Sequence, residues 1–400
     1  MAARYPDYND PTRSDLNPAR KDDRPVAKVT LLGPSLAAVS GVSTHLLQLI
    51  HSDLGAKFDL EHFQIGSEGR NEGFMGKGVR ILISPFLLAL HLLKCRSSIV
   101  HINTSLVQKG YWRDVVYLLT AKILRRKVVF QVHGGALPED FFGGSRLLSN
   151  LLRWILRQPD VVVLLASCEL SAYRRFVPRA RLTVIANAVD AEALRQERPI
   201  RSQGDPLRVV YIGRLADGKG IPDIVEAVGI LRNRDVKIIL SIAGSGPLEQ
   251  ALRELVSAKG LGDRVNFVGA VFGEAKNLLW LQSDVFAFPT LREGLPYAIL
   301  ESMAAGAVPV TTPVGAIPDV LTDKVHGLFV SPHDSGAVAD AIQWLDAHRG
   351  ELETMRVAGR RRIDECYTVA RLAGDFARLY EQVLGFSREA DHLLPGSTAL

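Results

Sequence analysis

Cysteine is scarce in this chain. Its 400 residues include only Cys95, Cys168 and Cys366, and no CxxC pair or Cys/His cluster with the spacing of a zinc site occurs. The sequence therefore predicts neither a disulfide framework nor a structural metal site. Few, widely spaced cysteines are typical of a reducing compartment, so we expect a cytoplasmic protein.

Long apolar runs are also missing. The most apolar segment, residues 79–94, is interrupted by Pro85 and His91. At about 16 residues it is shorter than the roughly 20 that a membrane-spanning helix needs. We predict a helix buried in a core or an interface. A helix resting on a membrane surface is the second interpretation, and a spanning helix is the third.

The two ends of the sequence lack apolar patterning. Residues 1–26 are polar and contain no apolar core of the kind found in secretion signals. We predict a disordered tail over residues 1–26 and a loose tail over residues 386–400.

Two nucleotide-binding signatures are absent or incomplete. The P-loop pattern GxxxxGK[ST] does not occur. The segment AGSGPLEQAL, residues 243–252, has a GxG without the third glycine of the dinucleotide fingerprint, and no acid stands at a convincing ribose position. A strand-to-helix turn explains this segment. We predict no nicotinamide and no other cofactor.

Charge is unevenly distributed along the chain. Residues 28–190 hold 20 Lys and Arg against 11 Asp and Glu, a net charge of +9, whereas residues 191–400 hold 23 against 27, a net charge of −4. Lipid head groups, a pyrophosphate-linked acceptor or a nucleic acid would each suit the basic half. Ordinary surface charge explains it equally well. A nucleic-acid partner is not predicted, because aromatic and basic residues are not interleaved.

Short apolar runs alternate with longer amphipathic runs, which predicts two doubly wound α/β domains. Strands that are apolar throughout and separated by helices favour parallel sheets covered on both faces. We place the domains at residues 27–190 and 208–385, with a charged linker at 191–207 and a last helix that can pack back on the first domain. Ligands of such sheets bind at the carboxyl ends of the strands.

A basic loop follows the first predicted strand of the second domain. The sequence GRLADGKG, residues 213–220, carries Arg214 and Lys219 between glycines and leads into a predicted helix. A helix N-terminus attracts anions, and the two cations could hold a diphosphate. A solvated basic turn is the equally good alternative for this motif taken alone.

Two glutamates bracket the start of another predicted helix. In LREGLPYAILESMAAG, residues 291–306, Pro296 suits a first helical turn and Gly306 suits a helix end. Glu293 then lies in the loop before the helix, and Glu301 lies about a turn and a half inside it. These carboxylates could accept hydrogen bonds from hydroxyl groups of a ligand. A helix-start acid and an exposed helix residue are the structural alternative.

Together these features resemble the retaining glycosyltransferases of family 4. The segment from Glu293 to Glu301 resembles that family's E-x7-E signature, residues 302–321 resemble its continuation, and GRLADGKG resembles its G-R-L…K-G element. The resemblance covers most of residues 27–385 and is strongest from 211 to 330. It implies the GT-B fold, in which two Rossmann-like domains face a deep interdomain cleft.

The resemblance also implies roles for residues of the second domain. Arg214 and Lys219 would hold the donor diphosphate and act in catalysis. Glu293 would contact the donor sugar as a further catalytic residue, and Glu301 would accept hydrogen bonds from the ribose. Two backbone positions, Gly294 and Leu295, would offer N–H groups, and the backbone around Val268 would contact the base.

In the first domain the resemblance points to two positions. His133, in QVHGG, matches a catalytic histidine at the sugar end of the cleft, although a lone histidine at a strand end is more often structural. Gly41, in SGVSTH, would let the backbone approach the diphosphate or the acceptor. This loop has Ser40 where the family has a glycine, and the NAVD turn that starts at Asn187 replaces the commoner Asn-Gly-Val-Asp.

The implied activity is transfer of a sugar from a nucleotide-diphosphate sugar to an acceptor hydroxyl, with retention of configuration. A hexosyltransferase of cell-surface polysaccharide or lipid-linked glycan assembly is expected, with an anionic membrane surface as a further partner. No Asp-x-Asp triplet occurs, so we expect no metal ion. An epimerase or phosphorylase on the same scaffold, or a non-catalytic sugar-nucleotide-binding subunit, is the alternative.

Overall fold

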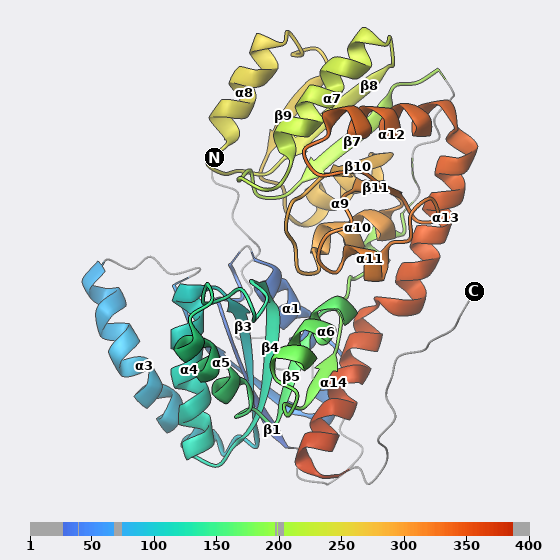
Figure 1. Ribbon diagram of the computed structural model, residues 1–400. Helices are drawn as coiled ribbons and strands as arrows, with labels where there is room; N and C mark the ends of the chain where they lie inside the picture. Colours follow the sequence, from blue (N-terminus) through green and yellow to red (C-terminus); the bar gives the residue numbers. More distant parts are fainter. Residues whose placement is uncertain (1–26, 39, 68–73, 197, 199–203, 387–400) are drawn as a thin grey trace.

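The computed structural model consists of two α/β domains (Figure 1). It describes residues 27–38, 40–67, 74–196, 198 and 204–386. The predicted tail at residues 1–26, and all but the first residue of the predicted tail at 386–400, lie outside the described residues.

The first domain is built on a six-stranded parallel sheet in the order β2-β1-β3-β4-β5-β6. The strands are β1 (Lys28–Gly33), β2 (Asp59–Gln64), β3 (Ile99–Leu106), β4 (Lys127–Gly135), β5 (Val161–Leu164) and β6 (Leu182–Val184). The helices are α1 (Gly41–Ile50), α2 (Leu54–Lys57), α3 (Phe74–Cys95), α4 (Gln108–Ile123), α5 (Arg146–Leu156) and α6 (Ser167–Phe176).

Alternating strand residues divide the first domain into two cores. Successive residues of a strand point to opposite faces of the sheet. Val128 of β4 therefore packs with residues of α3, α4, α5 and α6, whereas Val129 packs with residues of α1, α2 and α14 (Val369–Leu384). Both faces are covered, which is why these strands are apolar throughout.

The second domain repeats this architecture with a six-stranded parallel sheet in the order β12-β11-β10-β7-β8-β9. The strands are β7 (Leu207–Ile212), β8 (Ile238–Ala243), β9 (Val265–Gly269), β10 (Val285–Phe288), β11 (Val308–Thr311) and β12 (Leu328–Phe329). The helices are α7 (Ile221–Asn233), α8 (Glu249–Ala258), α9 (Gly273–Leu281), α10 (Tyr297–Ala305), α11 (Ile317–Val320), α12 (Ser335–Ala347) and α13 (Arg349–Cys366), and the 3-10 turn η2 (Glu192–Leu194) precedes them.

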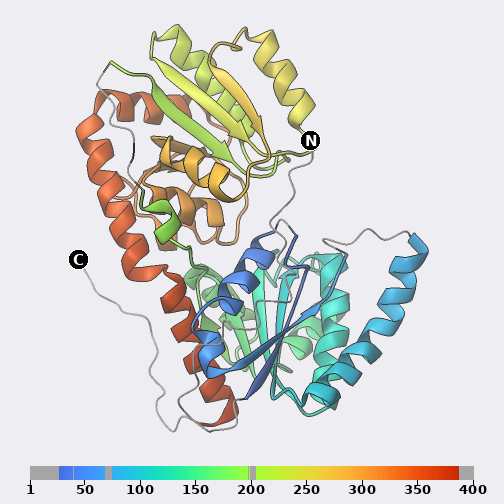
Figure 2. The same cartoon turned by 180° about the vertical axis from the view of Figure 1, so that it is seen from behind.

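The last helix returns to the first domain. Phe376 and Tyr380 of α14 are fully buried in the core that contains Leu31 of β1. The Tyr380 hydroxyl lies 2.7 Å from His101 Nδ1 on β3. Figures 1 and 2 show α13 and α14 running in succession along one side of both domains. This pair of helices therefore links the two domains away from the strand ends.

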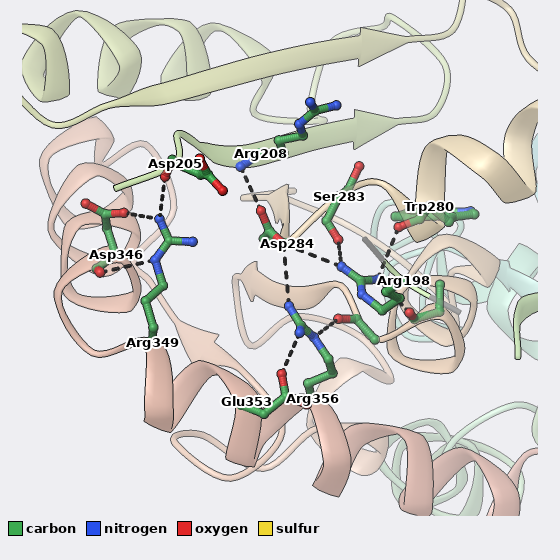
Figure 3. A network of polar contacts seen from close by, with 12 residues as sticks. Arg198, Asp205, Arg208, Trp280, Ser283, Asp284, Asp346, Arg349, Glu353 and Arg356 are labelled. Atoms are coloured by element: carbon green, nitrogen blue, oxygen red, sulfur yellow. Dashed lines mark hydrogen bonds and ion pairs between the residues drawn. The ribbon is translucent and has the colours of Figure 1, made fainter. Parts of the chain in front are cut away.

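Part of the predicted linker is held by the second domain (Figure 3). The Arg198 guanidinium donates to the carbonyl oxygens of Ala305, at 2.7 Å, and Ser283. It also lies 3.6 Å from a carboxylate oxygen of Asp284, which is 3.5 Å from Arg356 of α13. Because Asp284 is buried, two guanidinium groups are needed around it to compensate for lost hydration.

Two strands at the sheet edges do not fit the pattern of apolar runs that predicts the sheets. β2 reads DLEHFQ, with two acids and a histidine, and each of its residues is only partly buried. It lies at the edge of the sheet, where polar residues are tolerated, so the apolar pattern that identified its neighbours is absent. β12, also at an edge, is two residues long.

The helix predicted from residues 79–94 exists, but the expectation that the core of this chain buries it is wrong. α3 is longer than predicted and continues through Pro85. Its large apolar side chains are mostly exposed to solvent; these are Val79, Ile81, Leu82, Ile83, Phe86, Leu87, Leu90 and Leu93. Leu88 and Leu92 are its buried contribution to the core. Composition predicted the helix but not which side of it meets the protein.

Candidate active site

The loop from β7 to α7 carries Arg214 and Lys219 at the carboxyl edge of the second sheet. Gly220, the N-cap residue of α7, has a φ of +68°. A Cβ atom at this position would lie 2.0 Å from the carbonyl oxygen of Pro289. Glycine is needed here because the backbone conformation and the close approach both exclude a side chain. The N-terminus of α7 therefore faces the loop that carries Glu293.

Lys219 and Glu293 meet across these two loops. Lys219 Nζ donates to Glu293 Oε1, and the Thr290 hydroxyl donates to the same oxygen at 3.0 Å. The Leu291 N–H donates to the carbonyl oxygen of Gly218 at 2.8 Å, which ties the two loops together by their backbones. The Glu293 side chain is 12% exposed. The acid and the base are thus held in place as a pair before any ligand binds.

The loop between β11 and α11 packs against the backbone of the Glu293 loop. Gly315 has a φ of +58°, and a Cβ atom there would lie 2.0 Å from the carbonyl oxygen of Glu293. The Ala316 N–H donates to the carbonyl oxygen of Gly294 at 3.0 Å. The backbone of the Glu293 loop is therefore fixed by the segment between β11 and α11.

Arg214 differs from Lys219. Its side chain is exposed, and within the described part of the chain its guanidinium has no hydrogen bond or ion pair. The backbone beside it is fixed, because the Tyr211 hydroxyl donates to its carbonyl oxygen at 2.9 Å. An unpaired guanidinium on a fixed loop can bind phosphate oxygens with two parallel hydrogen bonds.

Glu301 lies on α10 and is engaged by α9. Lys276 Nζ donates to Glu301 Oε1 at 2.7 Å, and the indole N–H of the buried Trp280 donates to Oε2 at 3.1 Å. Helix α10 starts one residue later than predicted, with Pro296 as its N-cap, and ends as predicted at Gly306, whose φ is +77°. The structure thus places the two glutamates in two separate ion pairs, on either side of the helix start.

The two domains touch at Gly294. A Cβ atom on Gly294 would lie 3.3 Å from Gly134 Cα and 3.5 Å from the carbonyl oxygen of His133. The neighbouring Leu295 is 5% exposed, and its carbonyl oxygen accepts the Asn187 side-chain N–H at 2.9 Å. Sequence-distant segments of the two domains therefore bring the His133 loop against the Glu293 loop.

Gly41 lies at a second contact between the domains. It is the first residue of α1, after the Ser40 N-cap, and a Cβ atom there would lie 3.4 Å from the Tyr297 ring of α10. That distance is ordinary van der Waals contact. The protein's own packing therefore does not demand glycine at this position.

His133 is half-buried at the end of β4 and neutral. Asn103 Nδ2 donates to the carbonyl oxygen of Leu32 at 3.0 Å, so its Oδ1 accepts from His133 Nε2 at 2.8 Å. This leaves Nδ1 of His133 as a hydrogen-bond acceptor. Burial lowers the pKa of His133 to about 3.

Two further histidines were missed from the sequence. The His45 ring on α1 is fully buried with its centroid 4.8 Å from that of His133, and its two ring nitrogens have no hydrogen-bond partner among the described residues. His101 Nε2 donates to Gln131 Oε1 at 3.0 Å, and Nδ1 faces Tyr380. Burial lowers the pKa of both rings. His45 stands four residues after Gly41, so the two residues share one face of a helix. This spacing was the signal in the sequence that could have placed His45 near the site.

The remaining predicted position, Val268, is 44% exposed on β9 at the carboxyl edge of the sheet. The nearby AGSG turn has a structural explanation, as predicted. A Cβ atom on Gly244 would lie 1.9 Å from the carbonyl oxygen of Gly213, and one on Gly246 would lie 2.2 Å from that of Leu215. These glycines let the turn pack directly against the loop that carries Arg214.

One group of described residues has the geometry of metal ligands, and it lies elsewhere. Glu61 of β2 and the α3 residues His91 and Cys95 offer ligand atoms within 4.8 Å of one another. Lys28 Nζ donates to Glu61 Oε1 at 2.9 Å, and His91 Nε2 is 3.3 Å from Glu61 Oε2. Because Lys28 already balances the carboxylate, we interpret the cluster as a clamp between α3 and the sheet.

Two family profiles match consecutive parts of the chain. The profile "Glycosyltransferase Family 4" matches residues 38–193, and "Glycosyl transferases group 1" matches residues 193–362. The first profile falls on the domain with His133, and the second covers both ion pairs of the other domain.

Curated relatives carry related names. N-acetyl-alpha-D-glucosaminyl L-malate synthase of Bacillus anthracis is 27% identical over 274 residues, which are 65% of this chain and 69% of that protein. An uncharacterized glycosyltransferase of Methanocaldococcus jannaschii is 26% identical over 215 residues (51% and 55%), and the putative colanic acid biosynthesis glycosyltransferase WcaL of Escherichia coli is 29% identical over 171 residues (41% and 42%). The chain spans about half the length of these last two relatives.

Solved structures share the fold. Sucrose-phosphate synthase from Thermosynechococcus elongatus superposes with a TM-score of 0.73 at 20% identity, over 90% of this chain and 100% of that one. Anabaena HepE in complex with UDP superposes with a TM-score of 0.69 at 16% identity, over 89% and 100%. The predicted family and fold are confirmed. The chain belongs to the glycosyltransferases of the family 4 and group 1 kind, and it has their GT-B fold.

Proposed function

We propose that this protein transfers a hexosyl group from a nucleoside-diphosphate sugar to an acceptor hydroxyl, with retention of anomeric configuration. The observation that carries the proposal is the unpaired Arg214 beside the Lys219–Glu293 pair, at the place where Gly294 meets the His133 loop. One end of this arrangement suits a diphosphate and the other suits a sugar. Related structures were solved with UDP and with UDP-glucose, which supports a donor of this class.

The leaving diphosphate would be held by the basic loop. Arg214 offers a planar fork to its oxygens, and Lys219 adds a point charge near the N-terminus of α7. As the bond to the sugar breaks, negative charge grows on the phosphate, and cations already in place stabilise it without reorganising. Because these two side chains compensate the charge, we propose that the reaction needs no metal ion and no bound cofactor. Transfer should then be unchanged in EDTA.

The hydroxyl groups of the sugar and the ribose would donate hydrogen bonds to the neutral His133 and to the two ion-paired glutamates. His133 Nδ1 can accept a hydrogen bond from a sugar hydroxyl, because Nε2 is committed to Asn103. Glu293 can accept another, since its carboxylate has lone pairs beyond those that Lys219 and Thr290 use. Glu301 has the same capacity toward the ribose. The backbone N–H groups of Gly294 and Leu295 and the edge at Val268 remain proposed donor contacts.

In the proposed reaction, retention requires that the acceptor attack the face of the sugar from which the phosphate leaves. Glu293 is engaged by Lys219 and Thr290, which makes it a poor base for an attacking hydroxyl. In the proposed reaction the C–O bond to the phosphate breaks, the new C–O bond forms on the same face, and the leaving diphosphate takes the proton. The acceptor would be a glycan or a lipid-linked glycan in the cytoplasm, and Gly41, where the two domains meet, would contact it or the diphosphate.

A thermal-shift panel of nucleoside diphosphates and their sugars tests the proposal. A ligand that binds only the native state raises the melting temperature by mass action. We expect one diphosphate to stabilise the wild type and to lose most of that effect in Arg214→Gln. The matched control is Arg253→Gln, a cation whose guanidinium lies 4.4 Å from the Phe267 ring centre. A wild type that no nucleoside diphosphate stabilises would contradict the proposal.

A second measurement separates the alternatives. An epimerase converts a nucleotide sugar without any acceptor, whereas a transferase needs one, and a non-catalytic subunit binds the donor without turnover. With donor and acceptor present, proton NMR of the product should show the anomeric configuration of the donor. An inverted product would contradict retention while leaving the transfer intact.

A further inference from the structure

Helix α3 presents an apolar stripe to solvent. Val79, Ile83, Phe86, Leu90 and Leu93 recur at spacings of three and four residues, so they share one face of the helix. Each is exposed, with Phe86 at 73% and Leu90 at 64%. In Figures 1 and 2, α3 stands at the outer edge of the first domain with only its inner side against α4. A patch of this kind is rare on a monomer unless something binds it.

Other large apolar side chains are exposed on the helices beside α3. On α4 and α5, which cover the same face of the sheet, Ile123 and Leu147 are each 80% exposed, Trp112 is 42% exposed and Trp154 is 48% exposed. Tryptophan is enriched where an apolar medium meets water, because its ring is apolar and its N–H is polar.

The same part of the chain is strongly basic. Residues 74–157 contain 13 Lys and Arg but three Asp and Glu. One of these acids, Asp114, is buried and bound by Arg113. Lys94 and Arg96 are exposed at the end of α3, and Arg146 is exposed at the start of α5. The excess of +9 in the first half of the chain is therefore concentrated in the segment that contains α3, α4 and α5.

The inner side of α3 is fixed to the domain. Leu88 and Leu92 are fully buried, and the Tyr117 hydroxyl of α4 donates to Ser84 at 2.8 Å. His91 is paired with Glu61 of β2. Residues 76–95 are long and apolar enough to cross a membrane, but a crossing would break all of these contacts. A helix held on one side can bury its outer face only by lying flat on a surface.

We propose that the exposed face of α3, with its neighbours on α4 and α5, docks on an anionic lipid bilayer with α3 parallel to the membrane plane. An apolar stripe would enter the acyl boundary while the flanking Lys and Arg side chains reach the head groups. A second copy of this chain fits less well, because two faces of the same charge would oppose each other. This surface does not rest on the proposed transfer reaction.

Docking through α3 would determine from which side a lipid-linked acceptor reaches the candidate site. In a parallel sheet the helices begin at the carboxyl edge, so α3 starts at the same edge of the first sheet as the His133 loop. A lipid-linked acceptor held in the bilayer beside α3 would therefore be presented on the side where the candidate site lies.

Vesicle flotation with the full chain tests the docking surface. We expect binding to vesicles of phosphatidylcholine with phosphatidylglycerol at low salt, weak binding to phosphatidylcholine alone, and weaker binding to the anionic vesicles at high salt. Because these two large apolar side chains leave water when the helix docks, Phe86→Ser/Leu90→Ser should lower vesicle partitioning by roughly tenfold or more.

The matched control replaces exposed apolar residues of the second domain, as Val325→Ser/Val357→Ser, and should bind vesicles like the wild type. Circular dichroism and the melting temperature check that both variants fold. The proposal is overturned if the wild type ignores anionic vesicles at low salt or if the α3 variant still binds them. Light scattering that shows a dimer abolished by the α3 variant would assign the face to a second copy instead. Donor binding by thermal shift should be unchanged in both variants, so failure of the surface and failure of the proposed transfer are distinguishable.

Discussion

The two domains have similar sheets but place their polar chemistry differently. In the second domain the candidate acids are already paired, as in Lys219–Glu293 and Lys276–Glu301, and glycines with positive φ fix the loops that carry Lys219 and Glu293, whereas Arg214 stays unpaired among the described residues. In the first domain the corresponding edge holds the half-buried His133, with the buried rings of His45 and His101 close behind it, and all three are neutral. The second domain therefore offers a few side chains in fixed positions that suit anions and hydroxyl groups. The first domain offers neutral histidine rings and the exposed apolar face of α3.

The largest expected effect lies in the second domain. Lys219→Ala and Glu293→Ala should each lower turnover by about 100- to 1000-fold, because each removes a group that stabilises or positions developing charge. Steady-state kinetics with donor and acceptor check this. Lys259→Ala, which breaks the surface pair between Lys259 and Glu226 at 2.7 Å, is the matched control and should keep near-normal turnover. Near-normal transfer by either site variant would refute the assignment.

The second-largest effect is expected at Gly315, which packs against the backbone of Glu293. Gly315→Ala should lower the free energy of unfolding by roughly 3 kcal/mol, because the new Cβ meets the Glu293 carbonyl in a strained conformation. Gly273→Ala has the same sign of φ but open space around it, so it should cost about 1–2 kcal/mol. Denaturant titrations of both variants give the difference. Equal losses would mean that the close approach at Gly315 does not matter.

The first domain should respond to acid through its buried histidines. Burial lowers the pKa of His45 well below its usual range and that of His101 to about 3, so the folded protein keeps both rings neutral. Unfolded histidines bind protons near pH 6.5. The stability is therefore complete above about pH 6.5 and is lost as the pH falls from there toward 3.

Two variants measure how much each histidine contributes to the loss of stability in acid. His45→Leu, which removes a ring without hydrogen-bond partners, should flatten the fall in melting temperature between pH 7 and 5 at little cost at pH 7. His101→Leu should flatten it too but lower the free energy of unfolding by about 1–3 kcal/mol, because Gln131 and Tyr380 lose their partner. An unchanged acid slope in both would show that these rings do not set it.

The smallest effect compares two helix caps. Ser40 Oγ accepts from the Ser43 N–H at 3.2 Å at the start of α1, and Asp334 Oδ1 accepts from the Ala337 N–H at 2.8 Å at the start of α12. Ser40→Ala and Asp334→Ala should each cost about 1 kcal/mol in unfolding experiments. Only Ser40→Ala should also change KM, because Ser40 adjoins Gly41. Equal kinetics in the two variants would separate α1 from the site.

Much of the fold could be predicted because its signals are local. Apolar runs identified most strands, and Gly306 ended α10 where its αL conformation allows. The charged edge strand β2 was missed because its hydrogen bonds, rather than an apolar pattern, define it. The expectation that the core buries α3 was wrong because apolar content does not say which medium a helix face meets.

The site shows the same division. The glutamate motif and the basic loop were found from sequence because their spacing is specific. The clustering of His45, His101 and His133 could not be predicted, since α1, β3 and β4 bring them together only in the folded sheet. Nor did spacing reveal that Lys219 would pair with Glu293, 74 positions later in the chain.

By itself the sequence determined the family, the alternation of strands and helices, and the candidate residues, because these follow from residue types at short spacings. Tertiary structure alone decided that Gly294 would touch Gly134, that Phe376 and Tyr380 of α14 would be the residues buried in the first domain, and that an apolar helix would face outward. The physical reason is that such contacts depend on how two sheets and their helices pack, and packing selects partners that are far apart in the chain.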